Sequence, residues 1–374
     1  MVRLLSDDQV RLLRLRAQQL VPRPTRPAIG VAQVVKHLCG VQAQDAPAAA
    51  LAIRARRAGL VTADVERALV QERSIVRTWC MRGTLHFVSA EDLGWLLALL
   101  GPVFIRSSRG RRAQLGLDEN TAAQAIRALR DVLGKHGPLT RAEIVEQLKG
   151  RDICLVGQAR PHLLGLAALQ GVICFGPNRG REPTYVLLAD WVEPGPALPP
   201  EQARAELAHR YLSAYAPAAP EDFGAWSGLS LTEARAAWQH ISSQLTEVEI
   251  EGSSAWLLKT QATWLKRATP PRPIVRLLPS FDTLLLGYRS RDMVLAAKYS
   301  KRIYPGGGLL RPVLLVNGRA TGTWKVKRHQ DSIEVIVEPF EDLTADMRRG
   351  LEAEVEDLAH FQSVEAILKV MTPR

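Results

Sequence analysis

The 374-residue chain has few cysteines and no cluster of cysteine or histidine. Its four cysteines, Cys39, Cys80, Cys154 and Cys174, are scattered, without a CxxC pair. This pattern argues against a disulfide framework and a structural zinc site, and it fits a reducing cytoplasm. No apolar run approaches the ~20 residues that span a membrane, and residues 1–8 lack an apolar signal core. We therefore expect a cytoplasmic protein without a metal, a cofactor or a membrane partner.

Lysine is almost absent from residues 1–112, where Lys36 is the only lysine beside 17 arginines. This segment holds 18 Lys+Arg and 8 Asp+Glu, a net charge of +10, whereas the other 262 residues hold 31 and 30, a net of +1. A GC-rich genome would favour arginine codons, but it does not explain the uneven distribution. The planar fork of arginine suits bidentate phosphate contacts. The asymmetry predicts that the N-terminal end faces a polyanion.

A plan of helices followed by two short strands recurs along the chain, whose length predicts two to four domains. Capping boxes at Ser6, Thr140 and Ser230 each open a helix. Helices followed by a strand–loop–strand wing are the layout of a winged helix, a helix-turn-helix variant. The expected strand pairs are 75–79 with 84–88, 172–175 with 184–188, and 245–250 with 254–258.

The fold class predicted from this plan is α+β. Residues 1–112, 113–195 and 200–270 are expected to form one winged helix each, separated by Pro- and Ala-rich linkers at 192–200 and 268–273. Residues 271–374 differ, because 313–316, 320–327 and 332–338 alternate as strands before a helix at 345–361. This last domain is predicted to be a small β-barrel or a curled sheet.

Two glutamines one residue apart, Gln42 and Gln44, come shortly before Pro47. An i, i+2 pair points the same way on an extended segment, and Pro47 disfavours a continuous helix here. A carboxamide donates and accepts hydrogen bonds but does not titrate, so the pair can orient a water without acting as a strong general base. Asp45, directly after the pair, is either such a base or the cap of the helix that begins near Pro47.

Five separated motifs run in order along nearly the whole chain: VQAQ at 41–44, TWCMRGTLH at 78–86, DFGAWSG at 222–228, LPSFDTLL at 278–285 and VNGRATGTW at 316–324. Together they resemble the bacterial winged-helix DNA glycosylases of the AlkZ type. That resemblance implies three tandem winged helices and a C-terminal β-barrel arranged as a C-shaped clamp. It also implies that Gln42 and Gln44, with Ala43 between them, are the catalytic motif.

Enzymes of this family remove N7-alkylated purines and unhook interstrand crosslinks. A related branch carries Asp at the second polar position of the motif. With Gln44, the chain resembles the branch that includes self-resistance enzymes of antibiotic-producing bacteria. The resemblance also places a DNA-probing β-hairpin between Arg291 and Pro312, around Tyr304.

The chemistry of such a lesion suits two carboxamides. Alkylation at N7 gives guanine a full positive charge, so the base leaves through an oxocarbenium-like state with little acid catalysis. Gln42 and Gln44 can hold one water and present carbonyl oxygens to the sugar cation. Lys36 is the only lysine near the motif, so a Schiff-base step is not supported. Together with the resemblance, these arguments predict a monofunctional DNA glycosylase that acts on double-stranded DNA carrying N7-alkylpurine lesions and leaves an abasic site. The protein is further expected to be a monomer associated with the nucleoid.

Two groups of residues are predicted to contact DNA. Arg82, Thr84 and His86 are spaced i, i+2 on an expected wing strand, so their side chains would share one face. Either they grip phosphate or line the pocket, or His86 is a core histidine and Arg82 pairs with an internal carboxylate. The second group consists of Tyr304, Arg289 and Arg291.

Arg289 and Arg291 allow two interpretations. Either they contact DNA, or they form a buried ion pair with Asp282 that fixes the barrel against the helices. The glycines at 306–308 are expected to be the tip of a hairpin.

Other conspicuous residues are expected to be structural. The arginine-rich run 106–112 is expected to be a flexible, solvated linker suited to non-specific phosphate contact. Trp79, Trp226 and Trp324 are expected to pack in cores or between domains and not to stack on bases.

The main rival to a glycosylase is a winged-helix transcription regulator without catalytic activity. Such a regulator usually has one winged domain per subunit, dimerises, and reads base edges with a recognition helix. Three unlike copies followed by a barrel fit a monomeric clamp better. A catalytically idle lesion-sensing protein is a third possibility.

Overall fold

The computed structural model describes residues 2–23, 30–151, 153–193, 195–266 and 270–373. The protein has a mixed α+β fold, and its chain divides into two compact units. Unit 1 comprises Met1–Val65 and Arg204–Arg374, and unit 2 comprises Glu66–Ala203. Unit 1 is thus assembled from both ends of the chain. Residue 194 of the predicted linker 192–200, and residues 268–269 of the predicted linker 268–273, lie outside the described residues.

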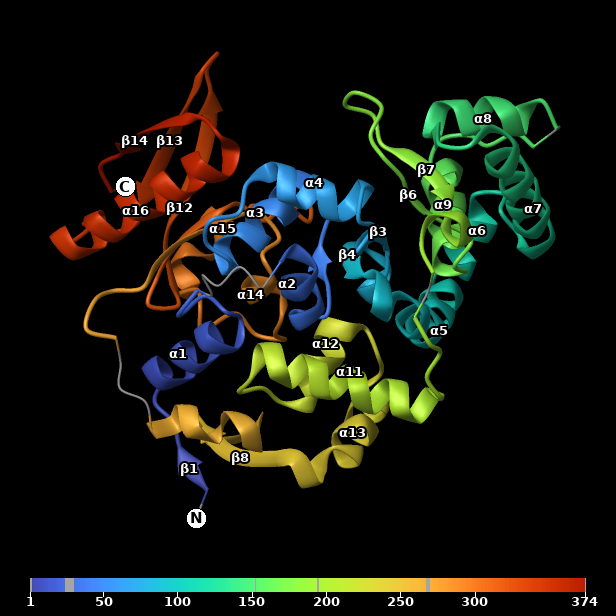
Figure 1. Ribbon diagram of the computed structural model, residues 1–374. Coiled ribbons are helices and arrows are strands. Elements are labelled where there is room, and N and C mark those ends of the chain that lie inside the picture. The colour runs from blue at the N-terminus through green and yellow to red at the C-terminus, as the bar shows by residue number, and fades with distance from the viewer. Residues whose placement is uncertain (1, 24–29, 152, 194, 267–269, 374) are drawn as a thin grey trace. The chain divides into compact units, whose positions relative to one another are not determined.

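Unit 2 contains an antiparallel hairpin, a long apolar helix and a group of three helices with its own small sheet (Figure 1). In the hairpin, β3 pairs with β4 so that Ile75 lies opposite Ser89. The small sheet has the order β5-β7-β6. The elements in this part of the chain are α4 (Thr62–Val70), β3 (Ile75–Trp79), β4 (Leu85–Ser89), α5 (Ala90–Ser107), α6 (Arg109–Gln114), α7 (Glu119–His136), β5 (Leu139–Thr140), α8 (Arg141–Lys149), α9 (Ala159–Leu169), β6 (Ile173–Phe175), β7 (Thr184–Leu187) and α10 (Leu188–Trp191).

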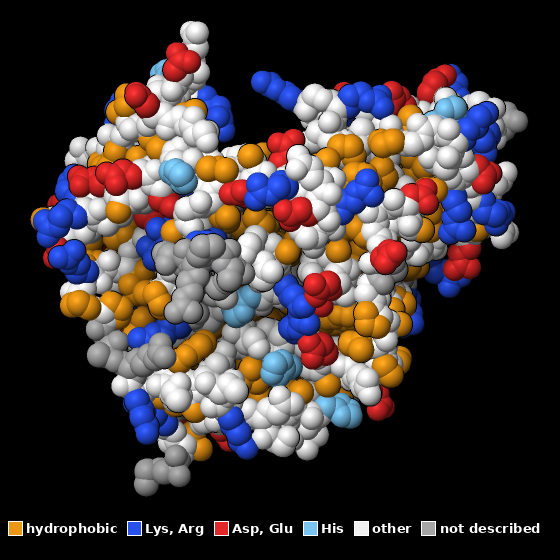
Figure 2. Space-filling view, viewed as in Figure 1, with side chains coloured by type: hydrophobic (Ala, Val, Ile, Leu, Met, Phe, Trp, Pro, Cys, Tyr) orange, Lys and Arg blue, Asp and Glu red, His pale blue; other side chains and the backbone are white. Residues whose placement is uncertain are grey.

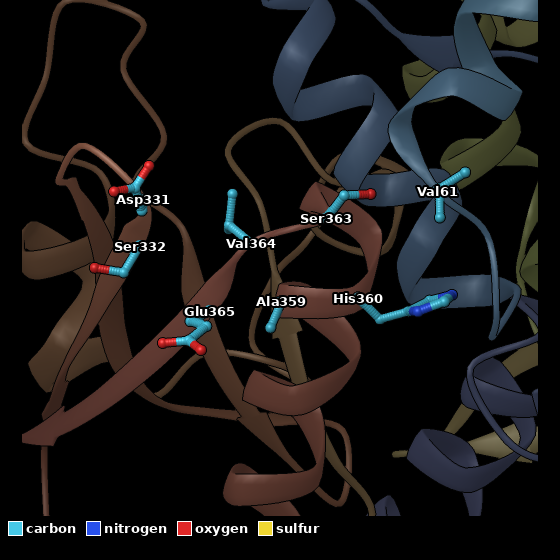
Figure 3. Close-up of a pocket in the computed structure, with 8 residues that line it drawn as sticks. All are labelled: Val61, Asp331, Ser332, Ala359, His360, Ser363, Val364 and Glu365. Carbon is cyan, nitrogen blue, oxygen red and sulfur yellow. The ribbon is translucent and has the colours of Figure 1, made fainter.

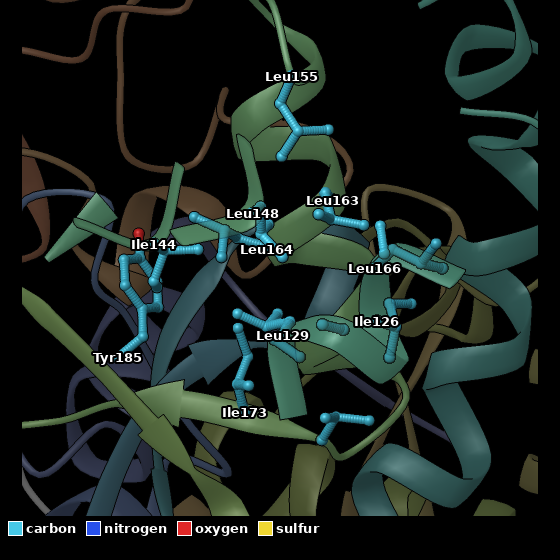
Figure 4. Close-up of a cluster of buried hydrophobic side chains, with 14 of the residues drawn as sticks. Ile126, Leu129, Ile144, Leu148, Leu155, Leu163, Leu164, Leu166, Ile173 and Tyr185 are labelled. Carbon is cyan, nitrogen blue, oxygen red and sulfur yellow. The ribbon is translucent and has the colours of Figure 1, made fainter. Parts of the chain in front are cut away.

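One hydrophobic cluster holds the helices and the small sheet of unit 2 together (Figure 4). Leu129 of α7, Ile144 of α8, Leu163 of α9 and Ile173 of β6 are all fully buried in it. Burying one such side chain contributes roughly 1.5–3 kcal/mol. Every residue of α9 from 163 to 169 is buried, so α9 is the central helix of this unit.

The N-terminal part of unit 1 begins with a short strand and three helices. α1 opens with the predicted capping box, in which the Gln9 backbone N–H donates to Ser6 Oγ (3.4 Å) and the Ser6 N–H donates to Gln9 Oε1 (3.0 Å). These bonds satisfy donors that the first helical turn leaves unpaired. The elements are β1 (Arg3–Leu4), α1 (Asp7–Ala17), α2 (Val31–His37), β2 (Val41–Gln42) and α3 (Ala46–Arg56).

A second part of unit 1 packs three helices around aromatic side chains. Tyr211 stacks on Tyr215 with ring centroids 4.8 Å apart, and it also contacts Trp226 (5.1 Å). The N-terminal strand β1 pairs in parallel with β8, beside the N-terminus in Figure 1. The elements are α11 (Pro200–Tyr215), α12 (Pro220–Ser227), α13 (Leu231–His240), β8 (Leu245–Ile250) and β9 (Ser253–Leu258).

The C-terminal part of unit 1 is an open, curled sheet in the order β10-β11-β12-β13-β14. Within the described residues its two edge strands, β10 and β14, pair with no common strand, and α16 packs against both of them. The sheet is therefore a half-barrel. The prediction of a closed barrel is wrong, and the alternative prediction of a curled sheet is confirmed. The elements are β10 (Val275–Leu278), α14 (Thr283–Leu286), α15 (Ser300–Ile303), β11 (Val313–Val316), β12 (Arg319–Arg328), β13 (Ser332–Pro339), α16 (Ala345–Gln362) and β14 (Glu365–Val370).

The arginine-rich run 106–112 is not the flexible linker that its composition suggested. It continues from the end of α5 into α6. Arg112 is buried, and its guanidinium donates to the Ile105 carbonyl (2.7 Å) and to Ser108 Oγ (2.5 Å). An arginine that satisfies the free carbonyls at a helix end stabilises that end. This internal role explains why the run is ordered.

The tryptophans behave as predicted. Trp226 and Trp324 are buried, and the Trp324 indole N–H donates to the Leu278 carbonyl (2.8 Å). Trp79 is half-buried and stacks on Phe175 with ring centroids 5.4 Å apart. The prediction that these rings pack internally is confirmed.

Among the described residues, no helix is both long enough and apolar enough to cross a membrane. The same residues contain no group of three or more His, Cys, Asp or Glu side chains placed to hold a metal ion.

Candidate active site

Gln42 and Gln44 lie on an extended segment of unit 1 between α2 and α3. Gly40 has a φ of 114°, a conformation that side-chain-bearing residues rarely adopt, and this turns the chain sharply after α2. Val41 and Ala43 are fully buried, whereas Gln42 is half-buried and Gln44 is exposed. This alternation follows the period of two of an extended chain. It agrees with the prediction that both carboxamides point to the side opposite Ala43.

Asp45 caps the helix that follows the glutamines. Its backbone is extended, and its side chain accepts a hydrogen bond from the Ala48 N–H at 3.1 Å. Pro47 lies in the first turn of α3, where the missing N–H of proline leaves no bond unmade. The capping interpretation of Asp45 is confirmed. The cap fixes where α3 begins, two residues after Gln44.

Arg82, Thr84 and His86 belong to unit 2, and they do not share one strand face. Arg82 lies in a short 3-10 turn with a left-handed backbone (φ 54°, ψ 17°), and β4 begins only at Leu85. The i, i+2 argument therefore fails for this trio, because the turn breaks the alternation. Arg82 and Thr84 are half-buried, and the Thr84 hydroxyl donates to the Met81 carbonyl (3.1 Å).

His86 is a buried histidine of β4, with 2% of its surface exposed. Its Nδ1 lies 3.0 Å from the Thr84 carbonyl oxygen. Burial, together with the nearby positive charge of Arg82, lowers the pKa of His86 to about 3. A neutral, buried imidazole offers no charge to a phosphate. Burial thus favours the core interpretation of His86, and its contact with DNA stays a prediction.

The lowered pKa makes His86 a source of acid sensitivity. The unfolded chain protonates this histidine near pH 6.5, while the folded protein does so only near pH 3. The unfolded state binds more protons across that interval, so stability is lost as the pH falls below about 6.5. From pH 7 to pH 5 this group alone is expected to remove about 2 kcal/mol of unfolding free energy.

Urea unfolding at both pH values measures this effect. The loss between pH 7 and pH 5 is expected to shrink by about 2 kcal/mol in His86→Gln. His136→Gln, which alters an exposed histidine at the end of α7, serves as the matched control and should leave the pH dependence unchanged. An equal pH dependence in wild type and His86→Gln would contradict the assignment.

Arg289, Arg291 and Tyr304 belong to unit 1. Both arginines are exposed, and the Arg289 backbone N–H donates to Asp222 Oδ1 (2.9 Å). The Arg291 guanidinium lies over the Tyr304 ring at 4.5 Å from its centroid. The structure thus brings two of the three predicted DNA-binding residues of this group into contact. The exposure of the two arginines is compatible with a phosphate contact, which stays a prediction.

The predicted hairpin around Tyr304 is a tight turn. It follows α15, and Gly306, Gly307 and Gly308 all have positive φ. A single bridge joins Gly306 to Leu309, whose side chain is 61% exposed. Such a backbone needs glycine, which explains the run of three.

The buried ion pair of Asp282 exists, but its partner is neither Arg289 nor Arg291. Asp282 is fully buried and accepts two hydrogen bonds of 2.8 Å from Arg56, the last residue of α3. The prediction of the partner was wrong because Arg289 and Arg291 are exposed, and the Arg291 guanidinium donates to the Leu285 carbonyl (3.3 Å) instead. Arg56 lies 226 residues away, and no local pattern identifies it.

A second buried arginine, Arg54, joins α3 to α16. Its guanidinium donates to Glu354 (3.2 Å) and to Asp357 (2.8 Å), and also to the Leu277 carbonyl (2.9 Å). Sequence reasoning missed both arginines of α3. The available signal was two arginines inside an otherwise apolar helix, where an unpaired charge would be strongly disfavoured.

Several arginines of residues 1–112 lie inside the protein. Arg14, for example, is buried with its guanidinium 3.7 Å from the ring centroid of Tyr288. The prediction that the basic excess marks a polyanion-facing end is therefore wrong for these side chains, since a buried guanidinium cannot meet a phosphate. On the face shown in Figure 2, basic side chains are spread among acidic and hydrophobic ones. The buried arginines of this segment are Arg11, Arg14, Arg54, Arg56, Arg57 and Arg112.

A surface pocket of about 760 Å³ lies in unit 1. It is formed by the end of α16, the starts of β13 and β14, and the residue before α4 (Figure 3). His360 points toward the segment of Val61, and Asp331 and Glu365 lie across the pocket from it. None of the predicted site residues lines this pocket.

Comparisons with known proteins agree with the fold and with the family resemblance. A family model described as DNA glycosylase AlkZ-like matches residues 35–361. An interstrand DNA cross-link repair glycosylase of Streptomyces sahachiroi is 33% identical over 383 residues, covering 97% of this chain and 98% of that protein. The solved structure of Streptomyces sahachiroi DNA glycosylase AlkZ matches with a TM-score of 0.80 and 30% identity, covering 98% of this chain and 100% of that one. These matches confirm the resemblance and do not support the regulator alternative. The chain belongs to the AlkZ-like DNA glycosylase family, and it is a DNA-repair hydrolase.

Proposed function

We propose that this glycosylase hydrolyses the N-glycosidic bond of N7-alkylated guanine in double-stranded DNA and leaves an abasic site. Its lesions are bulky natural-product adducts and, as the name of the Streptomyces relative suggests, interstrand crosslinks. The physiological setting is antibiotic self-resistance or alkylation repair. Gln42 and Gln44 are the catalytic residues of this proposal.

The arrangement of the glutamine loop carries the proposal. Gln44 is exposed and Gln42 is half-buried on one side of an extended segment, while the neighbouring carboxylate, Asp45, is occupied as a helix cap. A loop without a free carboxylate suits a base that leaves readily because it already carries a positive charge. The carboxamides are then left to hold one water and to shield the sugar cation.

Arg289, Arg291 and Tyr304 are proposed to contact the DNA backbone, and the exposure of the two arginines and the contact of Arg291 with the Tyr304 ring support this. Arg82 and Thr84 are proposed to contribute from unit 2. The glycine turn at 306–308 is proposed as the DNA-probing element.

The protein is proposed to act as a monomer with three winged helices. The second copy has the clearest support, because α7, α8 and α9 are followed by the hairpin of β6 and β7, and β5, between α7 and α8, pairs with β7, as in a winged helix. In the third copy, α11 to α13 precede the hairpin of β8 and β9.

The lesion is proposed to stay at least partly in the duplex during the reaction. A snug pocket for a flipped base would exclude a bulky adduct. The exposure of Gln44 supports a motif that approaches the lesion from outside the stack.

Base release from defined DNA lesions tests the proposed function. Purified protein is incubated with duplexes that carry N7-methylguanine, a bulky N7 adduct or an N7-linked interstrand crosslink, and the released base is quantified by mass spectrometry. Release from all three is expected, with none from undamaged DNA. If no N7-alkylated duplex loses its base, the proposed specificity is wrong.

The reaction is expected to proceed without a covalent enzyme–DNA intermediate. Lys36, the only lysine among residues 1–112, is half-buried on α2 and precedes the motif by six residues. Borohydride added during turnover is therefore expected to trap no protein–DNA adduct, whereas a lyase that forms a Schiff base gives one. A trapped adduct would refute the monofunctional mechanism.

Variants of Asp45 distinguish a role in capping α3, which affects stability, from a role as a catalytic base, which affects the rate of base release. Asparagine caps helices about as well as aspartate, so Asp45→Asn is expected to keep both the unfolding free energy and the rate of base release. Asp45→Ala should lower the unfolding free energy by about 1 kcal/mol. Both quantities are measured by urea unfolding and by single-turnover release. A stable Asp45→Asn protein that had lost its activity would show that Asp45 is a base after all.

A further inference from the structure

Helix α3 is held by two buried arginines near its C-terminal end. Arg54 and Arg56 are two residues apart, which places them about 200° apart around the helix. Both are buried, with 1% and 0% of their surface exposed. Arg54 binds carboxylates of α16, whereas Arg56 binds Asp282. Helix α3, which starts two residues after Gln44, is therefore fixed on two sides.

The Arg56 pair connects three separate stretches of unit 1. Besides the two bonds to Asp282, Arg56 donates to Gln18 Oε1 (2.6 Å) at the end of α1 and to Thr283 Oγ1 (2.7 Å). Asp282 also caps α14, because its Oδ1 accepts a bond from the Leu284 N–H (2.9 Å). One guanidinium thus sets the relative places of α1, α3 and α14.

The segment after α14 is tightly packed against aromatic side chains of α11. A Cβ on Gly287 would lie 2.4 Å from the Tyr215 ring, so this position accepts no side chain. The Tyr211 hydroxyl donates to the Gly287 carbonyl (2.7 Å), and the Tyr288 hydroxyl donates to the Tyr215 carbonyl (3.0 Å). Arg289 comes directly after Tyr288. The position of Asp282 therefore constrains the position of the segment that is proposed to contact DNA.

We propose that Arg56 and Asp282 are positioning residues for base release, which hold the loop of Gln42 and Gln44 in place relative to the segment of Arg289. This inference rests on the proposed roles of those residues. A two-point arginine–carboxylate bond is directional, so it fixes orientation as well as distance. A misplacement of about 1 Å in a group that orients the attacking water lowers the rate by roughly 100-fold.

Arg56→Lys is the decisive variant, because it keeps the positive charge and loses the two-point bond. We expect kcat for release of N7-methylguanine to fall about 10- to 100-fold, while KM and the affinity for undamaged DNA change less than about 3-fold, since many phosphate contacts contribute to binding. The matched control is Ile53→Val, which removes one methyl group from a fully buried residue of α3 without touching the ion pair. Ile53→Val is expected to destabilise the protein mildly and to keep kcat within about 2-fold of wild type.

A second readout does not depend on any substrate. Hydrogen–deuterium exchange followed by mass spectrometry is expected to show faster exchange over residues 41–48 and 283–291 in Arg56→Lys, with unchanged exchange in unit 2 and in Ile53→Val. If wild type releases base and Arg56→Lys does so equally fast, or if its kcat falls no further than that of Ile53→Val, the positioning role is wrong. If wild type itself releases no N7-methylguanine, the proposed function fails, and unchanged exchange at 41–48 then separately overturns the positioning role.

Discussion

Replacing Gln42 and Gln44 together with alanine is expected to lower the rate of N7-methylguanine release by at least about 100-fold. Removing one well-oriented polar group from an active site typically costs 10²–10³ in rate. Here both groups that hold the water and face the sugar cation are lost. The uncatalysed loss of this charged base sets the lower limit, so the residual rate should approach that of DNA without enzyme.

Single-turnover kinetics with enzyme in excess measures the effect, because they report the chemical step and not product release. Gln42→Ala and Gln44→Ala are tested singly, and the larger loss identifies the residue that holds the water. Gln71→Ala changes an exposed glutamine after α4 and should act like wild type. Both glutamines lie outside the cores, so the double variant should unfold at the wild-type urea concentration. Base release at the wild-type rate by the folded double variant would rule out the catalytic assignment.

Glu354→Ala is expected to lower the unfolding free energy by about 3–5 kcal/mol, the range for breaking a buried ion pair by removing one partner. Glu354 has 1% of its surface exposed and lies within 3.3 Å of Arg23, Arg54 and Arg276. It also accepts a hydrogen bond from the Leu277 N–H (3.0 Å). Its loss leaves buried guanidinium groups with less compensating charge and a strand N–H without its acceptor.

The pKa of Arg276 shows how much this site depends on the carboxylate. Burial lowers that pKa to about 10, and the negative charge of Glu354 opposes the shift. Urea unfolding of Glu354→Ala beside Glu352→Ala is the measurement, because Glu352 is exposed on the same helix. The control should stay within about 0.5 kcal/mol of wild type. Equal stabilities of the two variants would mean that the cluster around Glu354 contributes little.

The local parts of the fold were predictable from sequence because their determinants are local. The capping boxes at Ser6, Thr140 and Ser230 all form as predicted. Each box depends on two side chains three residues apart and on the adjacent backbone. For the same reason, the cap role of Asp45 was among the alternatives that the sequence offered.

Features set by distant contacts were not predictable. Helix α5 was not anticipated, since Gly101 and Pro102 interrupt its apolar pattern. Gly101 is required there by packing, because a Cβ would lie 2.4 Å from the Leu169 carbonyl oxygen. The pairing of β1 with β8, and that of Arg56 with Asp282, join residues more than 200 positions apart. No periodicity within either segment encodes such a partner.

The site was predicted in composition more than in geometry. The extended glutamine pair follows from Pro47 and the i, i+2 spacing. The shared face of Arg82, Thr84 and His86 failed because a left-handed residue, Arg82, breaks the strand. Sign and count of charge predicted an exposed basic surface, yet burial depends on where carboxylates such as Asp282 and Glu354 meet the arginines in three dimensions.

The assembly of unit 1 from both ends of the chain affects the order in which the protein folds during synthesis. Unit 2 is continuous and can fold once it leaves the ribosome, whereas Gln42 and Gln44 emerge early and their supporting residues come late. At 5–20 residues per second, Asp282 is made roughly 10–50 s after Gln44, and Glu354 later still. A chain interrupted before residue 282 cannot form the Arg56 pair. The ion pair that fixes the helix after the glutamine motif therefore forms only after residue 282 has been made, so chains interrupted before it are not expected to release bases from DNA.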